Sequence, residues 1–343
     1  MVRYIENLKQ FLDEVAKGYR LFVPRQRPEG WFFEPYEGEE VKLEGYPNTV
    51  ASAKEYLFPQ TETLYRFQAG EEGLQYDDRA ASPTGQVIFG ARPCDCAALK
   101  RLDQVFLEDD RDPYYAGRRE NTVMIGLVCP AAVAPSCFCT EVGLSPAGEE
   151  GMDLRATEVG DGLVIEEISD RGAALFGSPT LKDGKSWREA SAEEAAEAGR
   201  LQEAAQRDMA PSQDLAGIEL DFDDPLWGRE AERCIGCGIC AFLCPTCHCF
   251  TIEHDGSKKK GQAIRTWDTC QFQAYSLEAS GFNPRPDREQ RLKQRLFHKF
   301  KYFSDRYGML LCIGCGRCVS ACPVNIDIRE ILASFERKNR VTS

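Results

Sequence analysis

The sequence predicts an α+β protein in which a mixed α/β N-terminal domain is followed by a cysteine-rich, mainly helical C-terminal domain. Two apolar runs in the first half, Gln86–Phe89 and Thr122–Val128, are typical of buried strands. A cysteine-rich run occurs twice in the last third, at residues 234–245 and 312–323. The whole chain has a formal net charge of −13, yet basic side chains outnumber acidic ones from residue 228 onward. This asymmetry supports a domain boundary near residue 227.

Periodicity and proline predict the remaining N-terminal elements. Apolar side chains recur at helical spacing from Tyr4 to Val15 and indicate an amphipathic opening helix. Arg20–Val23 predicts a strand that ends at Pro24. The two buried strands each run directly into cysteines, so a site is expected where they end. We assign this α/β domain to residues 1–180.

The second half is predicted to be largely helical. Ser186–Met209 is rich in Ala and Glu and indicates an exposed helix, and the acidic, proline-containing Ala210–Trp227 indicates a linker. Arg285–Tyr307 is a basic, aromatic helix candidate, and Ile328–Lys338 is a terminal one. We assign residues 181–227 to helix and linker and residues 228–343 to the C-terminal domain. The cations of the basic helix are expected to form either a solvated face or a docking surface for an acidic partner: Arg288, Arg291, Lys293, Arg295, Lys299 and Lys301.

Composition excludes several classes of protein. Of the 343 residues, 43% are hydrophobic and 28% charged, which is typical of a soluble globular protein. Met1–Phe11 carries charges where a signal peptide would be apolar, and the uncharged stretch Asn121–Thr140 is interrupted by Pro130 and Pro135. We therefore expect a cytoplasmic protein without membrane insertion. The acidic net charge argues against a nucleic-acid partner.

The two cysteine-rich runs, CIGCGICAFLCP and CIGCGRCVSACP, are identical at eight of twelve positions. Each has the spacing C-x2-C-x2-C-x3-C-P, which holds cubane iron–sulfur clusters in bacterial ferredoxins, and the fourth cysteine of each run binds the other cluster. This predicts a ferredoxin-like domain with two [4Fe–4S] clusters and a long insertion between its runs. The first cluster would be held by Cys234, Cys237, Cys240 and Cys322, and the second by Cys312, Cys315, Cys318 and Cys244. Zinc is the alternative, but zinc ribbons lack such a run.

Eight of the sixteen cysteines lie outside these positions. Because disulfides rarely persist in the cytoplasm, metal binding is the default explanation for so many. Five lie on the loops that follow the two buried strands, and four of these could hold a third [4Fe–4S] cluster: Cys94, Cys129, Cys137 and Cys139. Cys96 would be spare. The alternative is that all five are small buried hydrophobic residues.

The last three cysteines, Cys247, Cys249 and Cys270, follow the first run and are one thiol short of a cluster. His248, His254 or Asp268 could complete a metal site. We favour the alternative, in which these thiols pack beside the clusters.

Seven segments of the chain resemble a known family. They are GARPCDCAALKRLDQVFL, DPYYAGRREN, the C…CFC segment, CPTCHCF, RTWDTCQF, FNPRPDREQRLKQRLFHKFKY and CIGCGRCVSACPVNID. The family comprises the beta subunits of soluble hydrogenases (sulfhydrogenases) and the A subunit of anaerobic sulfite reductase, and the resemblance extends from about Gln86 onward. It implies a subunit that relays single electrons between a flavin subunit that binds NAD(P)H and a catalytic subunit, such as a hydrogenase, a siroheme sulfite reductase or a heterodisulfide-reductase-like protein. It supports Cys94, Cys129, Cys137 and Cys139 as ligands, and Cys96 departs from its pattern.

No sequence feature indicates a catalytic site. There is no G-x-G-x-x-G after a strand, no P-loop and only three histidines, so no catalytic residue is assigned. The leading hypothesis is an electron-transfer subunit of a hetero-oligomeric oxidoreductase. The alternatives are a self-contained reductase that binds its substrate at the N-terminal cluster, and an adaptor whose clusters are only structural.

Overall fold

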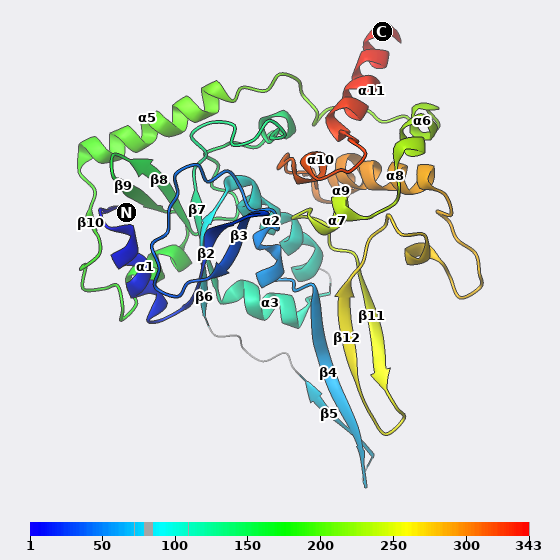
Figure 1. Cartoon of the computed structure of the whole chain (residues 1–343), viewed down its shortest axis with the longest axis horizontal. Coiled ribbons are helices and arrows are strands. Elements are labelled where there is room, and N and C mark those ends of the chain that lie inside the picture. Colours follow the sequence, from blue (N-terminus) through cyan, green and yellow to red (C-terminus); the bar gives the residue numbers. More distant parts are fainter. Residues whose placement is uncertain (72, 79–84, 109, 343) are drawn as a thin grey trace.

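The computed structural model describes residues 1–71, 73–78, 85–108 and 110–342, and it has two β-sheets (Figure 1). The larger sheet has eight strands in the order β10-β1-β9-β8-β7-β6-β2-β3, and the smaller has four in the order β11-β12-β4-β5. The strands of the larger sheet are β1 (Val2–Ile5), β2 (Arg20–Arg27), β3 (Gly30–Pro35), β6 (Gln86–Ala91), β7 (Thr122–Leu127), β8 (Leu154–Val159), β9 (Gly162–Glu167) and β10 (Arg188–Glu189). Those of the smaller sheet are β4 (Thr61–Gly70), β5 (Gly73–Asp78), β11 (Phe250–Gly256) and β12 (Lys260–Trp267).

The helices fall into two groups along the chain. Those before residue 210 are α1 (Leu8–Ala16), α2 (Pro93–Leu107), α3 (Pro113–Glu120), α4 (Asp170–Phe176) and α5 (Ala192–Asp208), with short 3-10 turns η1 (Ala53–Tyr56) and η2 (Thr140–Val142). Those after it are α6 (Leu226–Arg233), α7 (Ile239–Phe242), η3 (Gln273–Ser276), α8 (Arg288–Phe297), the π-helical η4 (His298–Tyr302), α9 (Phe303–Tyr307), α10 (Arg317–Ser320) and α11 (Ile328–Thr342).

The centre of the larger sheet is parallel and covered on both faces. β2, β6, β7 and β8 run parallel, and every residue of β6 and β7 is buried. Side chains from α1 and α4 pack on one face, and side chains from α2 and α3 pack on the other. Because β6 and β7 are neighbouring parallel strands, their carboxyl ends lie at the same edge of the sheet, as the sequence predicted for the loops that carry cysteines.

Two N-terminal predictions were wrong in their boundaries. Tyr4 and Ile5 belong to β1, which pairs with β9, so the opening helix begins only at Leu8. β2 does not end at Pro24 but continues to Arg27. Pro24 is tolerated because β2 pairs with β6 only through its first three residues, and a proline beyond Phe22 leaves that parallel ladder intact.

The predicted linker packs against the C-terminal helices. Leu215 and Trp227 are fully buried, and the Trp227 indole N–H donates to the carbonyl of Asp221 at 2.8 Å. Trp227 also stacks on Phe297 of α8 and Phe335 of α11. A second core therefore lies among α6, α8 and α11.

The long insertion between the two cysteine-rich runs forms part of both halves of the molecule. Its hairpin, β11–β12, pairs through β12 with β4, and together with β5 these strands form the sheet that projects from the body in Figure 1. The halves also meet where the Phe138 N–H donates to the carbonyl of Gly314 at 2.8 Å. Among the described residues, no helix has the length and apolar character that crossing a membrane requires.

Candidate metal centres

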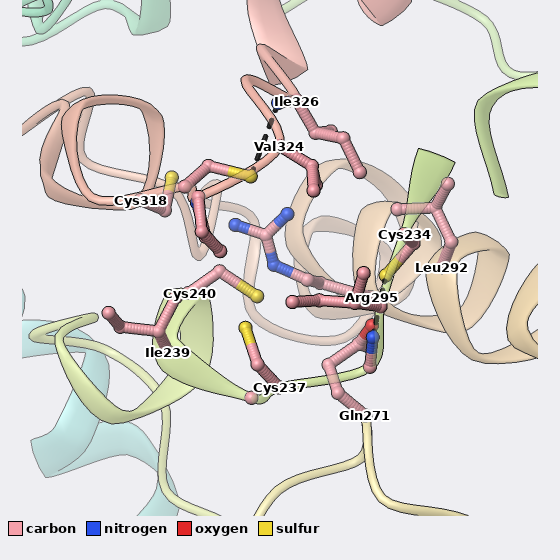
Figure 2. A pocket seen from close by; sticks show the side chains of 15 residues that line it. Cys234, Cys237, Ile239, Cys240, Gln271, Leu292, Arg295, Cys318, Val324 and Ile326 are labelled. Atoms are coloured by element: carbon pink, nitrogen blue, oxygen red, sulfur yellow. Dashed lines mark hydrogen bonds between the residues drawn. The ribbon is translucent and has the colours of Figure 1, made fainter. Parts of the chain in front are cut away.

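Three cysteines of the first run surround one hollow. Cys234 and Cys237 lie on the turn between α6 and α7, Cys240 is in α7, and all three line one hollow. Figure 2 shows their side chains around it. Cys322, the last cysteine of the second run, lines the same hollow. The structure thus brings together the four side chains that the crossed ferredoxin pattern assigns to the first cluster.

Backbone geometry directs amide groups at these sulfurs. Gly236 and Gly238 have φ values of +70° and +76°, a conformation that glycine adopts at low cost. The Gly236 N–H donates to Cys234 Sγ at 3.4 Å, and the Ile326 N–H donates to Cys322 Sγ at 3.2 Å. Such donors stabilise negative charge on sulfur.

The second set combines the second run with Cys244. Cys312 and Cys315 each lie close enough to both Cys244 and Cys318 for their charges to interact. The Lys299 ammonium donates to Cys244 Sγ at 3.2 Å and to Thr246 Oγ1 at 3.3 Å. Cys318 also lines the first hollow, so the two sets adjoin.

The third set lies at the edge of the larger sheet. Cys94 is in the first turn of α2, Cys129 follows β7, and Cys137 and Cys139 lie on the loop before η2. All four line a single hollow. The cysteines predicted for a third cluster are therefore gathered at one place, although Cys94 begins a helix instead of lying in a loop.

The hollow lined by the third set, called the third hollow below, borders the second set of cysteines. Cys315 lines it together with the four N-terminal cysteines. A Cβ atom added to Gly314 would lie 2.5 Å from the Cα atom of Cys139, and one added to Gly316 would lie 2.2 Å from the carbonyl oxygen of Ser136. The two cysteine loops thus pack backbone to backbone at the glycines of the second run.

Burial keeps many of these thiols protonated. It raises the pKa of Cys129 to about 12, and the pKa of Cys139, Cys240 and Cys312 to about 11 each. Cys244 differs, because a hydrogen bond with Cys247 and the charge of Lys299 lower its pKa despite burial. Buried thiols become thiolates when a cationic group binds and displaces their protons.

A [4Fe–4S] group fits this donor set. Five cysteines line each hollow: the four assigned ligands and one member of the second set. A zinc ion is held by four ligands with Zn–S distances of about 2.3 Å, whereas a cubane cluster is held by four thiolates spaced around a larger group. In the first hollow, Arg295 also has two buried nitrogens, Nε and Nη2, without a hydrogen-bond partner. Such orphaned donors suit a cluster whose sulfides accept hydrogen bonds and whose core, together with four thiolates, has a net negative charge.

Cys96 lies apart from these sets. Its side chain is fully buried in the core beneath α2, with Ile88, Leu99 and Met124 in the same cluster. Its thiol faces the carbonyl of Ala91 at 3.9 Å. Cys96 lines neither of the two hollows.

The remaining cysteines form two contacts instead of one centre. Cys247 interacts with Cys244, and Cys249 interacts with Cys270 and Tyr275. Of the side chains proposed to complete a metal site, His254 lies on β11 against Tyr65 at 3.0 Å, and the Thr251 hydroxyl donates to Asp268 at 2.6 Å. Within the part of the chain that is described, no three His, Cys, Asp or Glu side chains could hold a single metal ion.

The basic helix was predicted wrongly as a solvated face or docking surface. Four of its six cations are buried, and only two are exposed, Arg288 and Lys301. Arg295 reaches the first hollow and Lys299 the second set. Their spacing of four residues, together with the intervening Leu296, was the only signal in the sequence that could have placed them on an inward face.

Comparison with known proteins agrees with this geometry. Residues 233–326 match the model of a 4Fe-4S dicluster domain. The chain is also 28% identical over 345 residues to sulfhydrogenase 2 subunit beta of Pyrococcus furiosus, and the match covers 96% of this chain and 98% of the relative. The chain is therefore similar to a sulfhydrogenase beta subunit over nearly its whole length. Because the relative is matched almost from end to end, the likeness extends into the N-terminal domain.

The dicluster match supports [4Fe–4S] clusters in the C-terminal part of the chain. The matched residues contain both cysteine-rich runs and the insertion between them. The fold is the predicted one, a mixed α/β N-terminal part followed by a ferredoxin-like helical part.

Proposed function

We propose that this chain is the electron-transfer subunit of a hydrogenase-like oxidoreductase complex and holds three [4Fe–4S] clusters. The first is assigned to Cys234, Cys237, Cys240 and Cys322, the second to Cys312, Cys315, Cys318 and Cys244, and the third to Cys94, Cys129, Cys137 and Cys139. A bound cluster of this type takes up and releases one electron at a time.

The observation that carries the proposal is the continuity of the three sets. Cys318 lines the first hollow, and Cys315 lines the third, so the second set adjoins both. Residues far apart in the chain produce this series, since Cys94 and Cys315 border the same hollow. A series of adjoining redox sites suits a relay between two partners better than a single substrate site does.

The ends of the series differ in exposure. Cys237 of the first set is exposed, and the neighbouring Ile235 is 58% exposed. In the third set, Cys129 and Cys139 are buried. We assign the exposed first set to contact with one partner subunit. The partners proposed are a flavin subunit that binds NAD(P)H and a catalytic redox subunit, in keeping with a relative that is named as one subunit of a sulfhydrogenase.

Iron analysis and reduction test the proposal. Protein prepared anaerobically should contain about twelve irons and as many labile sulfides, at about four per cluster. Cys94→Ser should remove about four irons, whereas the matched control Cys96→Ser, two residues along the same helix, should remove none. About eight irons in the wild type, with no further loss in Cys94→Ser, would exclude the third cluster.

Electron flow is the second test. NAD(P)H should not reduce the clusters of the isolated chain, and it should reduce them once a flavoprotein subunit of the complex is added. Turnover of a substrate such as sulfite by the isolated chain with an artificial electron donor would instead favour the self-contained reductase. Clusters that cannot be reversibly reduced would favour the structural adaptor.

A further inference from the structure

Two buried cations face the two ferredoxin-type sets from one side of a helix. Arg295 is on α8 and Lys299 is on η4, four residues and about one turn later. Their exposed fractions are 4% and 3%. Among the described residues, neither forms an ion pair with an Asp or Glu side chain.

A buried positive charge without a carboxylate partner is unfavourable unless another group compensates it. Arg295 lines the first hollow, with its Nε and Nη2 atoms unpartnered, and Figure 2 shows its guanidinium reaching toward the cysteine sulfurs. Lys299 donates at 3.2 Å to the sulfur of Cys244, a predicted ligand of the second cluster. Arg295 therefore faces the first hollow, and Lys299 faces the sulfur of Cys244 and the hydroxyl of Thr246.

Other buried arginines near the cysteines are satisfied differently. Arg317 forms a two-pronged ion pair with Asp95, with distances of 2.6 and 2.7 Å. Arg92 donates to backbone carbonyls, including that of Val128 at 2.9 Å. On the same helix as Arg295, Arg291 donates to the carbonyl of Pro286 at 2.7 Å. Arg295 and Lys299 differ from Arg317 in having no carboxylate partner among the described residues, and the partners of Lys299 are Cys244 Sγ and Thr246 Oγ1.

We propose that Arg295 and Lys299 are positioning residues that set the reduction potentials of the two ferredoxin-type clusters, Arg295 acting on the first and Lys299 on the second. The inference rests on the proposed function. One-electron reduction adds one negative charge, so a fixed positive charge nearby stabilises the reduced form relative to the oxidised form. Each cation would therefore raise the potential of its own cluster, by charge and by N–H donation to sulfur.

The test is a redox titration of the full iron-loaded chain, followed by electron paramagnetic resonance. The two signals are first assigned with Cys237→Ser and Cys315→Ser. At a fixed solution potential, Arg295→Met should lower the ratio of reduced to oxidised first cluster tenfold or more, which equals a shift of about 59 mV or more for one electron. Lys299→Met should do the same to the second signal, and Arg295→Lys should retain most of the wild-type value.

Arg291→Met is the matched control, because it removes a buried arginine one turn earlier on the same helix. It should leave both potentials unchanged. Normal iron content with unchanged potentials in Arg295→Met and Lys299→Met would overturn the inference, and so would equal shifts in Arg291→Met. If Arg295→Met loses iron, Arg295→Gln is measured in its place. A potential of the first cluster that is equal in Arg295→Gln and Arg295→Lys would also overturn the inference. Failure of the proposed function looks different, since the wild-type protein would then lack cubane clusters or not reduce them.

Discussion

The ion pair between Asp95 and Arg317 joins the second and third sets of cysteines, and its removal gives a quantitative test of the structure. Asp95 follows Cys94 in the first turn of α2, and Arg317 precedes Cys318 at the start of α10. The two side chains are 222 residues apart in sequence and are 2% and 6% exposed. Breaking this pair should therefore loosen the contact between the N-terminal sheet and the cysteine loop of the second run.

The expected magnitude follows from burial. Removing one partner of a buried ion pair costs about 3–5 kcal/mol, because the other charge is left uncompensated. In Asp95→Asn, Arg317 would keep its bonds to the carbonyl of Thr49 at 2.8 Å and to Asn48 Oδ1 at 2.7 Å, so we expect a cost of about 3 kcal/mol. At about 2–4 °C per kcal/mol, the apparent melting temperature should fall by about 6–12 °C.

The assay is anaerobic thermal unfolding of iron-loaded protein at one scan rate, since unfolding with cluster loss is irreversible. Asp305→Asn is the control. It breaks an exposed pair with Lys301 and should cost less than about 1 kcal/mol. The double variant Asp95→Leu/Arg317→Met should recover part of the fall in melting temperature, because neither charge is then left buried without its partner. The reasoning would be refuted if Asp95→Asn melted at the same temperature as the control. It would also be refuted if the melting temperature of the double variant fell by more than the sum of the falls in the two single variants.

Two further predictions concern the cysteine loops. Cys244→Ser should damage the second cluster and resemble Cys315→Ser in paramagnetic resonance; a spectrum like that of a variant in the first run would show that the crossed assignment is wrong. Gly314→Ala should lower iron content and cost more than about 1–2 kcal/mol, because its φ is +64° and its Cβ would lie 2.5 Å from backbone atoms of Cys139. Gly308→Ala is the control, because Gly308 has a φ of +69° and nothing lies within 4 Å of the added Cβ. Equal losses of iron and stability in the two variants would contradict the contact between Gly314 and Cys139.

The strand-to-cysteine segments were predictable because their signal is local. Gln86–Phe89 and Thr122–Val128 are apolar throughout, and the structure has β6 and β7 there with every residue buried. Parallel neighbours end at one edge, so the meeting of Cys94 and Cys129 followed from the order of strands. The strand at Val2–Ile5 was missed because its apolar residues also satisfy helical spacing, and only its pairing with β9 decides between the two.

The basic helix was mispredicted for a related reason. Lys and Arg are usually exposed, so a helix rich in them predicts a solvated face. Here the hollow and the sulfur of Cys244 lie beneath α8 and η4, and they provide surroundings in which Arg295 and Lys299 can be buried. No property of the helix itself reveals what lies beneath it.

The sequence by itself determined which chemistry the C-terminal part is built for. Cysteine spacing is covalent and local: the turn that presents Cys234, Cys237 and Cys240 depends on a few neighbouring residues and on Gly236 and Gly238, whose positive φ values few other residues adopt readily.

Only the tertiary structure decided how the three sets adjoin and which charges face them. The 67 residues between Cys244 and Cys312 return through β12 to pair with β4, and Gly314 packs on the backbone of Cys139. These contacts join segments far apart in the chain. They depend on the packing of whole sheets and helices, and no local pattern of residues encodes that packing.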